Sequence, residues 1–236
     1  MANFLLNSPN SYQDWNSNDD DYQKRKKENI EKENSLEFWE NYYSSKKTFS
    51  AADIQVYDDL LPDVIADKIH NFEKDIQWKY GYKNEKITLY PNKEQLEEIN
   101  YFYSDVNKNL FFINLFYKIL LPHLHIEKKE SIEIDRIFIT GQLHGLTSLF
   151  HKDERSSIKY GPSVYVLINN CWKSYYDGSL CFLLNNDNLD LYHVENSVNR
   201  VIVFPPDMYH KFCEISGYGL FENAFNCVLQ YHLIYQ

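Results

Sequence analysis

The chain lacks an excess of basic residues. It has 24 Lys and Arg against 34 Asp and Glu, so its formal net charge is -10. Proteins that bind nucleic-acid phosphates generally depend on clustered Lys and Arg, so this balance argues against a nucleic-acid partner. The one clear basic run, near the N-terminus, reads QKRKKENIEKE. Because acidic residues surround it, we interpret it as a solvated helix or tail.

The chain also lacks a C-x-x-C motif and any apolar run of membrane-spanning length. Its first residues, MANFLLNSPNS, have neither the basic start nor the apolar core of a signal peptide. We therefore expect a cytoplasmic protein with no membrane partner. The four cysteines, Cys171, Cys181, Cys213 and Cys227, are expected to be mostly buried free thiols. Zinc ligation by His and Cys is the alternative.

The polar and apolar residues divide the chain into two parts. Residues 1–50 are polar and predict a disordered or loosely helical segment. Residues 51–236 predict a single domain, because 44% of the chain is hydrophobic and the length suits one core. Within this domain we expect a helical lead-in at 53–125 and a β core at 130–235.

The lead-in predicts a strand in DIQVYDDLL, a helix in PDVIADKIHNFEKDI and a strand in IQWKYGY. A longer helix is predicted from Tyr103 to Leu121, ended by Pro122. The β core predicts about eight short strands bounded by turn residues, beginning with SIEIDRIFITG and TSLFH. This pattern favours a sandwich, a barrel or a double-sheet jelly roll.

The stretch TSLFHKDERSS, residues 147–157, holds a histidine and an aspartate separated by one residue. In a strand, residues i and i+2 project to the same face, so His151 and Asp153 would point together. Two His and one carboxylate on one face of iron(II) leave positions open for other ligands. The third ligand is expected to be His210, in RVIVFPPDMYHKF. The other candidates are His144, His193 and His232.

The order of the segments around this triplet resembles the iron(II)/2-oxoglutarate-dependent dioxygenases, in particular their prolyl-4-hydroxylase-like branch. That branch reads H-x-D, a strand ending near Y-L-N-x-x-W, then G-G-E-L-x-F, P-x-x-x-R-x-x-x-F and a distal His. The corresponding segments here are HKD at His151 to Asp153, LINNCW with Asn169 and Trp172, DGSLCF with Gly178 and Leu180, and ENSVNRVIVFPPDMYH with Arg200, Phe204 and His210.

The resemblance implies an α+β, mainly β fold: a double-stranded β-helix, or jelly roll, with the N-terminal helices packed on one sheet. It implies that His151, Asp153 and His210 bind Fe(II), and that 2-oxoglutarate is the cosubstrate, with ascorbate as a reductant. In this family, oxidative decarboxylation of 2-oxoglutarate is coupled to oxidation of a substrate. Asp153 favours hydroxylation, because the halogenases of the superfamily lack this carboxylate.

The final strand departs from the family pattern. Asn226 stands where the family has the Arg or Lys that binds the distal carboxylate of 2-oxoglutarate. A carboxylate in a pocket needs such a partner. Either Arg136 or Arg200 reaches into the site, or Asn226 and Gln230, together with His144, form a neutral pocket, or turnover has been lost.

Two tyrosines that help hold the cosubstrate in the family are also unmatched, and one of them corresponds to Leu167. We take His144, Leu167 and Trp172 as candidates for the substrate pocket.

Three functions are consistent with these patterns. The leading hypothesis is an Fe(II)- and 2-oxoglutarate-dependent oxygenase, a prolyl-4-hydroxylase-like hydroxylase acting on a small molecule or a peptide. The alternative is a non-catalytic jelly-roll module with a vestigial metal triad, which the absent cation favours. A non-oxidative metal enzyme on a cupin-like barrel is the third hypothesis. The fold alone does not identify the substrate.

Overall fold

The computed structural model describes residues 48–82, 99–146, 148, 150–153, 160–169, 172–185, 189–222 and 224–236. All of them belong to one unit, Thr48–Gln236. The predicted polar segment at 1–50 therefore lies outside the described residues, apart from residues 48–50.

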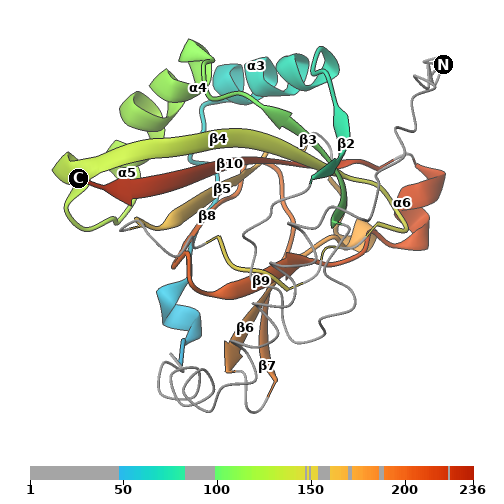
Figure 1. Cartoon of the computed structure of the whole chain (residues 1–236). Coiled ribbons are helices and arrows are strands. Elements are labelled where there is room, and N and C mark those ends of the chain that lie inside the picture. The colour runs from blue at the N-terminus through green and yellow to red at the C-terminus, as the bar shows by residue number, and fades with distance from the viewer. Residues whose placement is uncertain are drawn as a thin grey trace, which may run out of the picture. The chain divides into compact units, whose positions relative to one another are not determined.

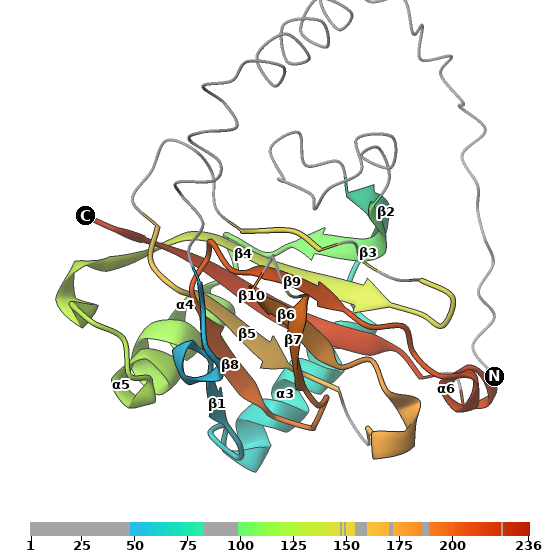
Figure 2. The ribbon, with the colours of Figure 1, turned by 90° about the horizontal axis from the view of Figure 1, so that it is seen from below.

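The described residues form three layers. Figure 1 shows the helices α3 (Asp63–Lys74) and α4 (Leu110–Leu115) on one face of a large sheet, with a small sheet on its other face. Figure 2, turned to look from below, shows the strands of the small sheet in front of the large one. This is the mainly β, double-sheet architecture that the sequence predicts, with the helices packed on one sheet.

The large sheet has seven strands in the order β1-β8-β5-β10-β4-β3-β2, and neighbouring strands pair antiparallel. Its central pair is the longest, because β10 and β4 are matched from Asn226↔Gln142 to Tyr235↔Ile132. The strand bounds are β1 Gln55–Tyr57, β2 Lys79–Tyr82, β3 Ile99–Asp105, β4 Ile132–Gln142, β5 Ser163–Leu167, β8 Val201–Phe204 and β10 Asn226–Tyr235.

The small sheet has three strands within the described ranges, in the order β7-β6-β9. They are β6 (Leu180–Asn185), β7 (Asp190–Val194) and β9 (Tyr209–Phe212). The predicted strand in TSLFH is reduced here to one antiparallel bridge, between His151 and His210; Thr147 and Leu149 lie outside the described residues. This bridge extends the small sheet beyond β9 at the point where the H-x-D triplet begins.

Alternation along the large sheet separates two apolar cores. The side chains of β5 illustrate this, because Val164 and Val166 pack towards the helices while Tyr165 and Leu167 pack between the sheets. The helix-side core is filled by large residues that include Phe112, Phe116, Leu120, Ile137, Ile139, Leu229 and Tyr231. The core between the sheets includes Leu180, Phe182, Ile202, Phe204, Met208 and Val228.

The helix predicted from Tyr103 to Leu121 is wrong at its start. Residues Ile99–Asp105 form β3, which pairs with β4, and α4 begins only at Leu110. The side chain of Asn109 accepts a hydrogen bond from the Phe111 N–H (2.9 Å), which caps the helix at this point. The aromatic residues of β3 suit a strand that has a neighbour to pair with.

The end of the predicted helix also differs from the structure. A π-helical stretch at Phe116–Leu120 leads into a short final turn, α5 (Leu121–His123). Pro122 therefore lies in the first turn of α5, where its missing N–H is tolerated, and does not end the helix.

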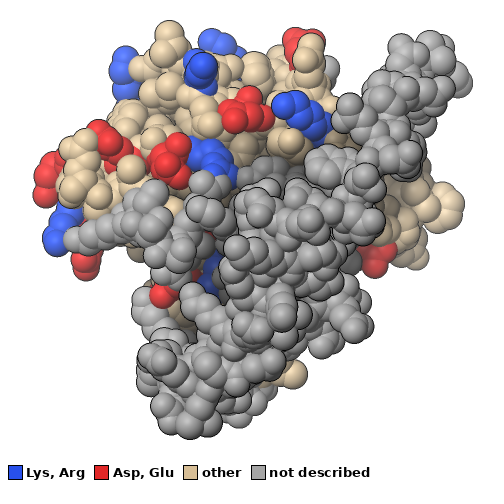
Figure 3. Space-filling view, in the orientation of Figure 1, with Lys and Arg blue, Asp and Glu red and all other residues tan. Residues whose placement is uncertain are grey.

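The surface carries charges of both signs. Figure 3 shows acidic and basic side chains interspersed over the described part of one face. Among the helices of the described ranges, none has the length and apolar character that crossing a membrane would require.

The packing of the Phe225 ring against Gly141 on β4 can be tested by substitution. A Cβ at Gly141 would lie 2.1 Å from Cζ of Phe225. The Phe225 ring is held edge-on against Trp78, with centroids 5.2 Å apart. We expect Gly141→Ala to lower the free energy of unfolding by about 1–3 kcal/mol, because the ring must move. Urea denaturation measures this.

The matched control is Gly217→Ala at the start of α6 (Gly217–Phe221), where a Cβ meets nothing within 4 Å. Its unfolding free energy should stay within about 0.5 kcal/mol of the parent. Equal stability of the Gly141→Ala variant and the parent would contradict the close packing.

Candidate metal centre

The three predicted metal ligands come together between the two sheets. The backbones of His151 and His210 exchange hydrogen bonds of 3.0 and 2.9 Å, so the two residues lie directly opposite each other. Two residues later, the Asp153 N–H donates to the Pro206 carbonyl at 3.0 Å. The imidazole and carboxylate ligand atoms of the three residues all lie within 4.8 Å of one another, and all three side chains are buried.

The Asp153 carboxylate is held by side chains from the neighbouring strand. The Ser163 hydroxyl donates to its Oδ2 at 2.6 Å, and the Tyr165 hydroxyl lies 3.1 Å from the same oxygen. Nε2 of His232, on β10, lies 3.5 Å from Oδ1. Burial raises the pKa of Asp153, but His232, His210 and His151 and the Ser163 hydrogen bond outweigh it, so the pKa falls to about 2. The carboxylate is therefore ionised at neutral pH.

The His210 side chain is neutral and is oriented so that Nε2 can bind a metal. Its Nδ1 lies 3.0 Å from the Met208 carbonyl oxygen. A carbonyl only accepts, so Nδ1 carries the proton and Nε2 keeps its lone pair. Burial lowers the pKa of His210 to about 4, which keeps the ring neutral at pH 7. Nε2 of His210 lies 2.9 Å from the Tyr165 hydroxyl, which also contacts Asp153.

These residues fit a divalent metal. A buried carboxylate requires positive charge nearby, and the described groups around Asp153 are histidines and hydroxyls, with no Lys or Arg among its closest partners. Two imidazoles and one carboxylate form the open-sided set that suits Fe(II). The aromatic rings of Phe204 and Phe182 lie 4.7 and 6.2 Å from the His210 ring and limit the access of water.

A small cavity of about 20 Å³ adjoins His151. This is room for about one water molecule, so a larger ligand requires side chains to move. None of the described residues around it is Lys or Arg. The lining residues are Tyr101, Thr140, Gly141, Gln142, Ser148, His151, Phe212, Asn226, Val228 and Gln230.

Two predicted cosubstrate residues, Asn226 and Gln230, lie in this wall. Oδ1 of Asn226 accepts from Asn169 (3.0 Å) and Asn196 (2.8 Å), while its Nδ2 donates to the Gly178 carbonyl at 3.3 Å. The Gln230 amide donates to Thr140 Oγ1 at 2.7 Å. Asn226, which we predicted to stand where the family has a cation, is thus a buried amide that already makes hydrogen bonds within the protein.

Of the two predicted arginines, Arg200 lies away from the cavity, whereas Arg136 lies on the same face of the large sheet as His232. Arg200 binds Asp58 through two contacts, of 2.7 and 2.9 Å, and donates to the Glu195 carbonyl at 2.6 Å. These contacts tie the start of β8 to the end of β1, outside the cavity. Arg136 lies on β4 opposite His232 in the register, and it is not among the residues that line the cavity.

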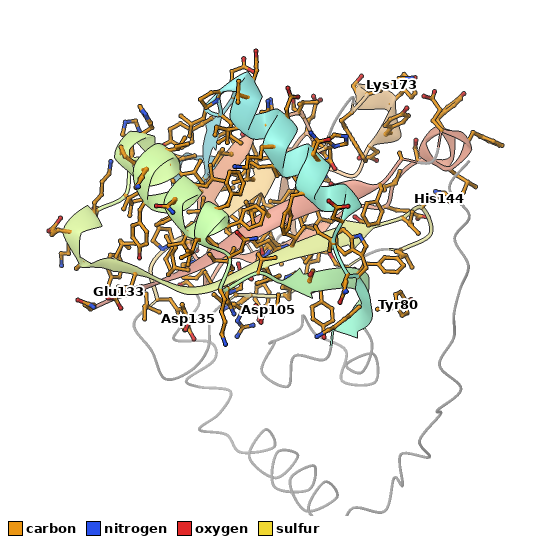
Figure 4. All side chains as sticks on the ribbon, turned by 90° about the horizontal axis from the view of Figure 1, so that it is seen from above. Tyr80, Asp105, Glu133, Asp135, His144 and Lys173 are labelled. Atoms are coloured by element: carbon orange, nitrogen blue, oxygen red, sulfur yellow. The ribbon has the colours of Figure 1, made fainter. Side chains whose placement is uncertain are left out.

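The three predicted substrate-pocket residues are not brought together in the cavity wall. Nδ1 of His144 lies 2.6 Å from the Ile215 carbonyl, and Figure 4 places it at the opposite end of β4 from Glu133. Leu167 packs in the core between the sheets. The Trp172 indole donates to the Asp177 carbonyl at 3.2 Å.

Sequence analysis missed Ser163 and Tyr165, which contact Asp153. The sequence does contain the pattern that indicates this contact. In a strand over SVYVL, side chains point alternately to the two faces, so Ser163, Tyr165 and Leu167 share one face. The apolar residues of SVYVL indicate a buried strand. A buried strand by itself assigns no function to the hydroxyls of Ser163 and Tyr165. His232, considered as a third ligand, lies beside Asp153 and not in the cluster of three.

The neutral state of His210 predicts a pH dependence for the metal-free protein. An unfolded histidine protonates near pH 6.5, whereas folded His210 stays neutral to about pH 4. Between these values the unfolded state binds the extra proton, so stability falls as the pH falls. We expect a loss of about 3 kcal/mol from this residue. Urea denaturation from pH 7 to pH 4 measures it, and His210→Asn should flatten the slope. If the unfolding free energies of the parent and of His210→Asn changed equally with pH, the neutral state of folded His210 would be contradicted.

No family model matches the chain, and no curated protein matches it. Solved structures do match. A 2OG-Fe(II) oxygenase family oxidoreductase from Burkholderia pseudomallei superposes with a TM-score of 0.57 at 10% identity, covering 78% of this chain and 86% of that one. A Pseudomonas putida prolyl-4-hydroxylase gives a TM-score of 0.52 at 10% identity, covering 78% and 93%.

A third match is HygX from Streptomyces hygroscopicus, solved with nickel, 2-oxoglutarate and hygromycin B bound. It gives a TM-score of 0.52 at 10% identity and covers 78% of this chain and 83% of that one. At such identities the likeness concerns the fold. The chain therefore has the jelly-roll fold of the iron(II)/2-oxoglutarate-dependent oxygenases, including their prolyl-4-hydroxylase-like branch, as the sequence motifs predicted.

Proposed function

We propose that this protein is a non-haem iron(II)- and 2-oxoglutarate-dependent oxygenase, a hydroxylase of the prolyl-4-hydroxylase-like type, whose catalytic domain spans residues 51–236. The observation that carries the proposal is the buried cluster of His151, Asp153 and His210, whose ligand atoms lie within 4.8 Å of one another. The cluster occupies the space between the sheets of a fold shared with 2OG-Fe(II) oxygenases.

In this proposal His151, Asp153 and His210 hold Fe(II). The metal supplies the redox chemistry that couples reduction of dioxygen to oxidation of cosubstrate and substrate. The protein contributes the ionised Asp153, which balances the metal charge, and the Met208 carbonyl, which fixes His210 with Nε2 towards the site. Ser163 orients the carboxylate through its 2.6 Å hydrogen bond. The Tyr165 hydroxyl contacts both Asp153 and His210 and would help to orient these two ligands.

The cosubstrate pocket of this proposal is neutral. Thr140, Gln142, Asn226 and Gln230 offer amides and a hydroxyl where the family has a cation. Hydrogen bonds between neutral groups and a carboxylate are weaker than those of an arginine fork. We therefore propose that 2-oxoglutarate binds weakly, or that a smaller or less charged 2-oxo acid is preferred.

The substrate is proposed to be a small molecule or a peptide. The solved neighbours include a prolyl-4-hydroxylase and a protein with hygromycin B bound, so this fold accommodates both classes in other proteins. The net charge of -10 argues against a nucleic-acid substrate. Ascorbate as a reductant, and a cytoplasmic location, stay predictions.

A second candidate is a non-catalytic jelly-roll module that binds a ligand or a partner. One observation favours this module: Asn226 already forms hydrogen bonds with Asn169, Asn196 and Gly178. In such a module the amide network braces β10 against the adjacent loops and the metal triad is a remnant.

The first test is an anaerobic Fe(II) titration with and without 2-oxoglutarate. We expect one Fe(II) per chain and a weak visible charge-transfer band when 2-oxoglutarate is added. His210→Ala should abolish the band, because it removes one of the two imidazole ligands. Iron binding without a band would point to a different cosubstrate. A parent protein that binds no Fe(II) would support the non-catalytic module and contradict the proposal.

A second test concerns Ser163. Ser163→Ala removes the hydrogen bond that orients Asp153, and groups that support metal ligands typically change affinity 10- to 100-fold. We therefore expect the Kd for Fe(II) to rise by about tenfold or more, measured by competition with a chelator. The control is Ser174→Ala, an exposed serine outside the site, which should leave the Kd unchanged. An unchanged Kd in Ser163→Ala would contradict the role of Ser163 in orienting Asp153 for metal binding.

A further inference from the structure

A second cluster of metal-ligand side chains lies on the outer face of the small sheet. Cys181 on β6 is opposite His193 on β7 and Lys211 on β9 in the antiparallel registers. Residues opposite each other share a face, and so do residues two apart, which brings Cys213 to the same face as Lys211. The backbone agrees, because the Cys213 N–H donates to the Ser179 carbonyl at 2.9 Å and continues the pairing of β9 with β6.

This outer face is separate from the candidate iron site. Leu180 and Phe182, which flank Cys181, pack in the core between the sheets. His210 is opposite Phe182 in the register, so it points inward with that residue. The two clusters therefore lie on opposite faces of the same three strands and share no ligand.

The three outer side chains are already close to metal-binding distances. Sγ of Cys181 lies 3.5 Å from Nε2 of His193, and Sγ of Cys213 lies 3.9 Å from Nδ1 of the same ring. Because one ion binds only one ring nitrogen, Cys213 must move towards Nε2 for all three residues to bind the same ion. One ligand atom from each residue can be chosen so that all three lie within 4.8 Å of one another. Ligands around tetrahedral zinc are about 3.5–3.8 Å apart, so contraction by about 1 Å completes the geometry.

The surroundings favour a thiolate. The pKa of the Cys213 thiol falls to about 6, because its hydrogen bond with the Cys181 thiol, with help from Ser179, His193 and Lys211, outweighs burial. The pKa of Cys181 is raised by the same hydrogen bond and by burial. The Cys213 thiol is thus ionised near neutral pH and can bind a cation, whereas the Cys181 thiol would release its proton when the cation binds.

The ring of His193 also has a supporting partner. Ser179 Oγ lies 3.4 Å from its Nδ1. With Nδ1 protonated towards this hydroxyl, Nε2 presents a lone pair beside Cys181. A hydrogen bond to the second ring nitrogen is the usual support of a metal-binding histidine.

We propose that Cys181, His193 and Cys213 bind a thiophilic divalent cation of the zinc type, with a fourth position open to water. Two thiolates and one imidazole are the soft and borderline ligands that select such ions over Fe(II), Mg²⁺ or Ca²⁺. The cation joins β6, β7 and β9, the strands that carry His210 and its cover of aromatic rings. Binding of the cation therefore stabilises the small sheet.

The test is a Co(II) titration of the reduced, metal-free, full-length protein, followed by absorption. We expect a thiolate-to-cobalt charge-transfer band that saturates at one equivalent and is bleached by added Zn²⁺. Cys213→Ser should abolish the band, and His193→Asn should weaken Co(II) binding about tenfold or more, because each removes a ligand.

Two control variants show whether the band arises from this cluster. His151→Ala, in the candidate iron site, and Cys227→Ala, at a buried cysteine on β10, should both retain the band. Circular dichroism of Cys213→Ser should match the parent, so that loss of the band reports the ligand and not the fold. Absence of the band in the reduced parent, or its survival in Cys213→Ser, would overturn the proposal. A Cys181–Cys213 disulfide that persists under reducing conditions would also overturn it.

Discussion

The arrangement around the candidate iron site depends on one buried anion. The Asp153 carboxylate lies between two sheets, and its ionised form requires stabilisation there. Histidines from β9, β10 and the H-x-D segment, together with hydroxyls from β5, provide that stabilisation. Each of these elements must be in register for the carboxylate to remain charged. The site and the packing of the two sheets are therefore one structural unit.

Strand alternation lets a three-stranded sheet carry two different sets of ligands. On its inner face His210 lies among aromatic rings, with a carboxylate and a second imidazole as neighbours. On its outer face Cys181, His193 and Cys213 form a softer set. The chemistry of the two faces differs. The inner face is buried and places His210 beside a carboxylate, whereas the outer face carries an exposed histidine and two thiols. A change in strand register would disrupt both sets together.

The neutral cavity distinguishes this chain from the motif pattern that it resembles. Oδ1 of Asn226 accepts hydrogen bonds from Asn169 and Asn196, and this network binds β10 to the loops after β5 and β7. A cation at that position would leave two amide groups without their partner in the wall. The asparagine is therefore part of the packing of the cavity, and Arg200, committed to Asp58, does not replace the cation.

From its alternating strands the sequence predicted a β core that could be a sandwich, a barrel or a jelly roll. The order of its motifs, through their resemblance to the dioxygenases, predicted the jelly roll and the convergence of His151, Asp153 and His210. The sequence did not determine the start of α4: the helix predicted from Tyr103 begins only at Leu110, because the residues up to Asp105 form β3 and pair with β4. Only the tertiary structure showed that Tyr165 and Ser163 hold Asp153, that Arg200 is committed to Asp58, and that Cys181, His193 and Cys213 meet. These contacts join residues on different strands, and strand pairing over long sequence separations cannot be inferred from local patterns.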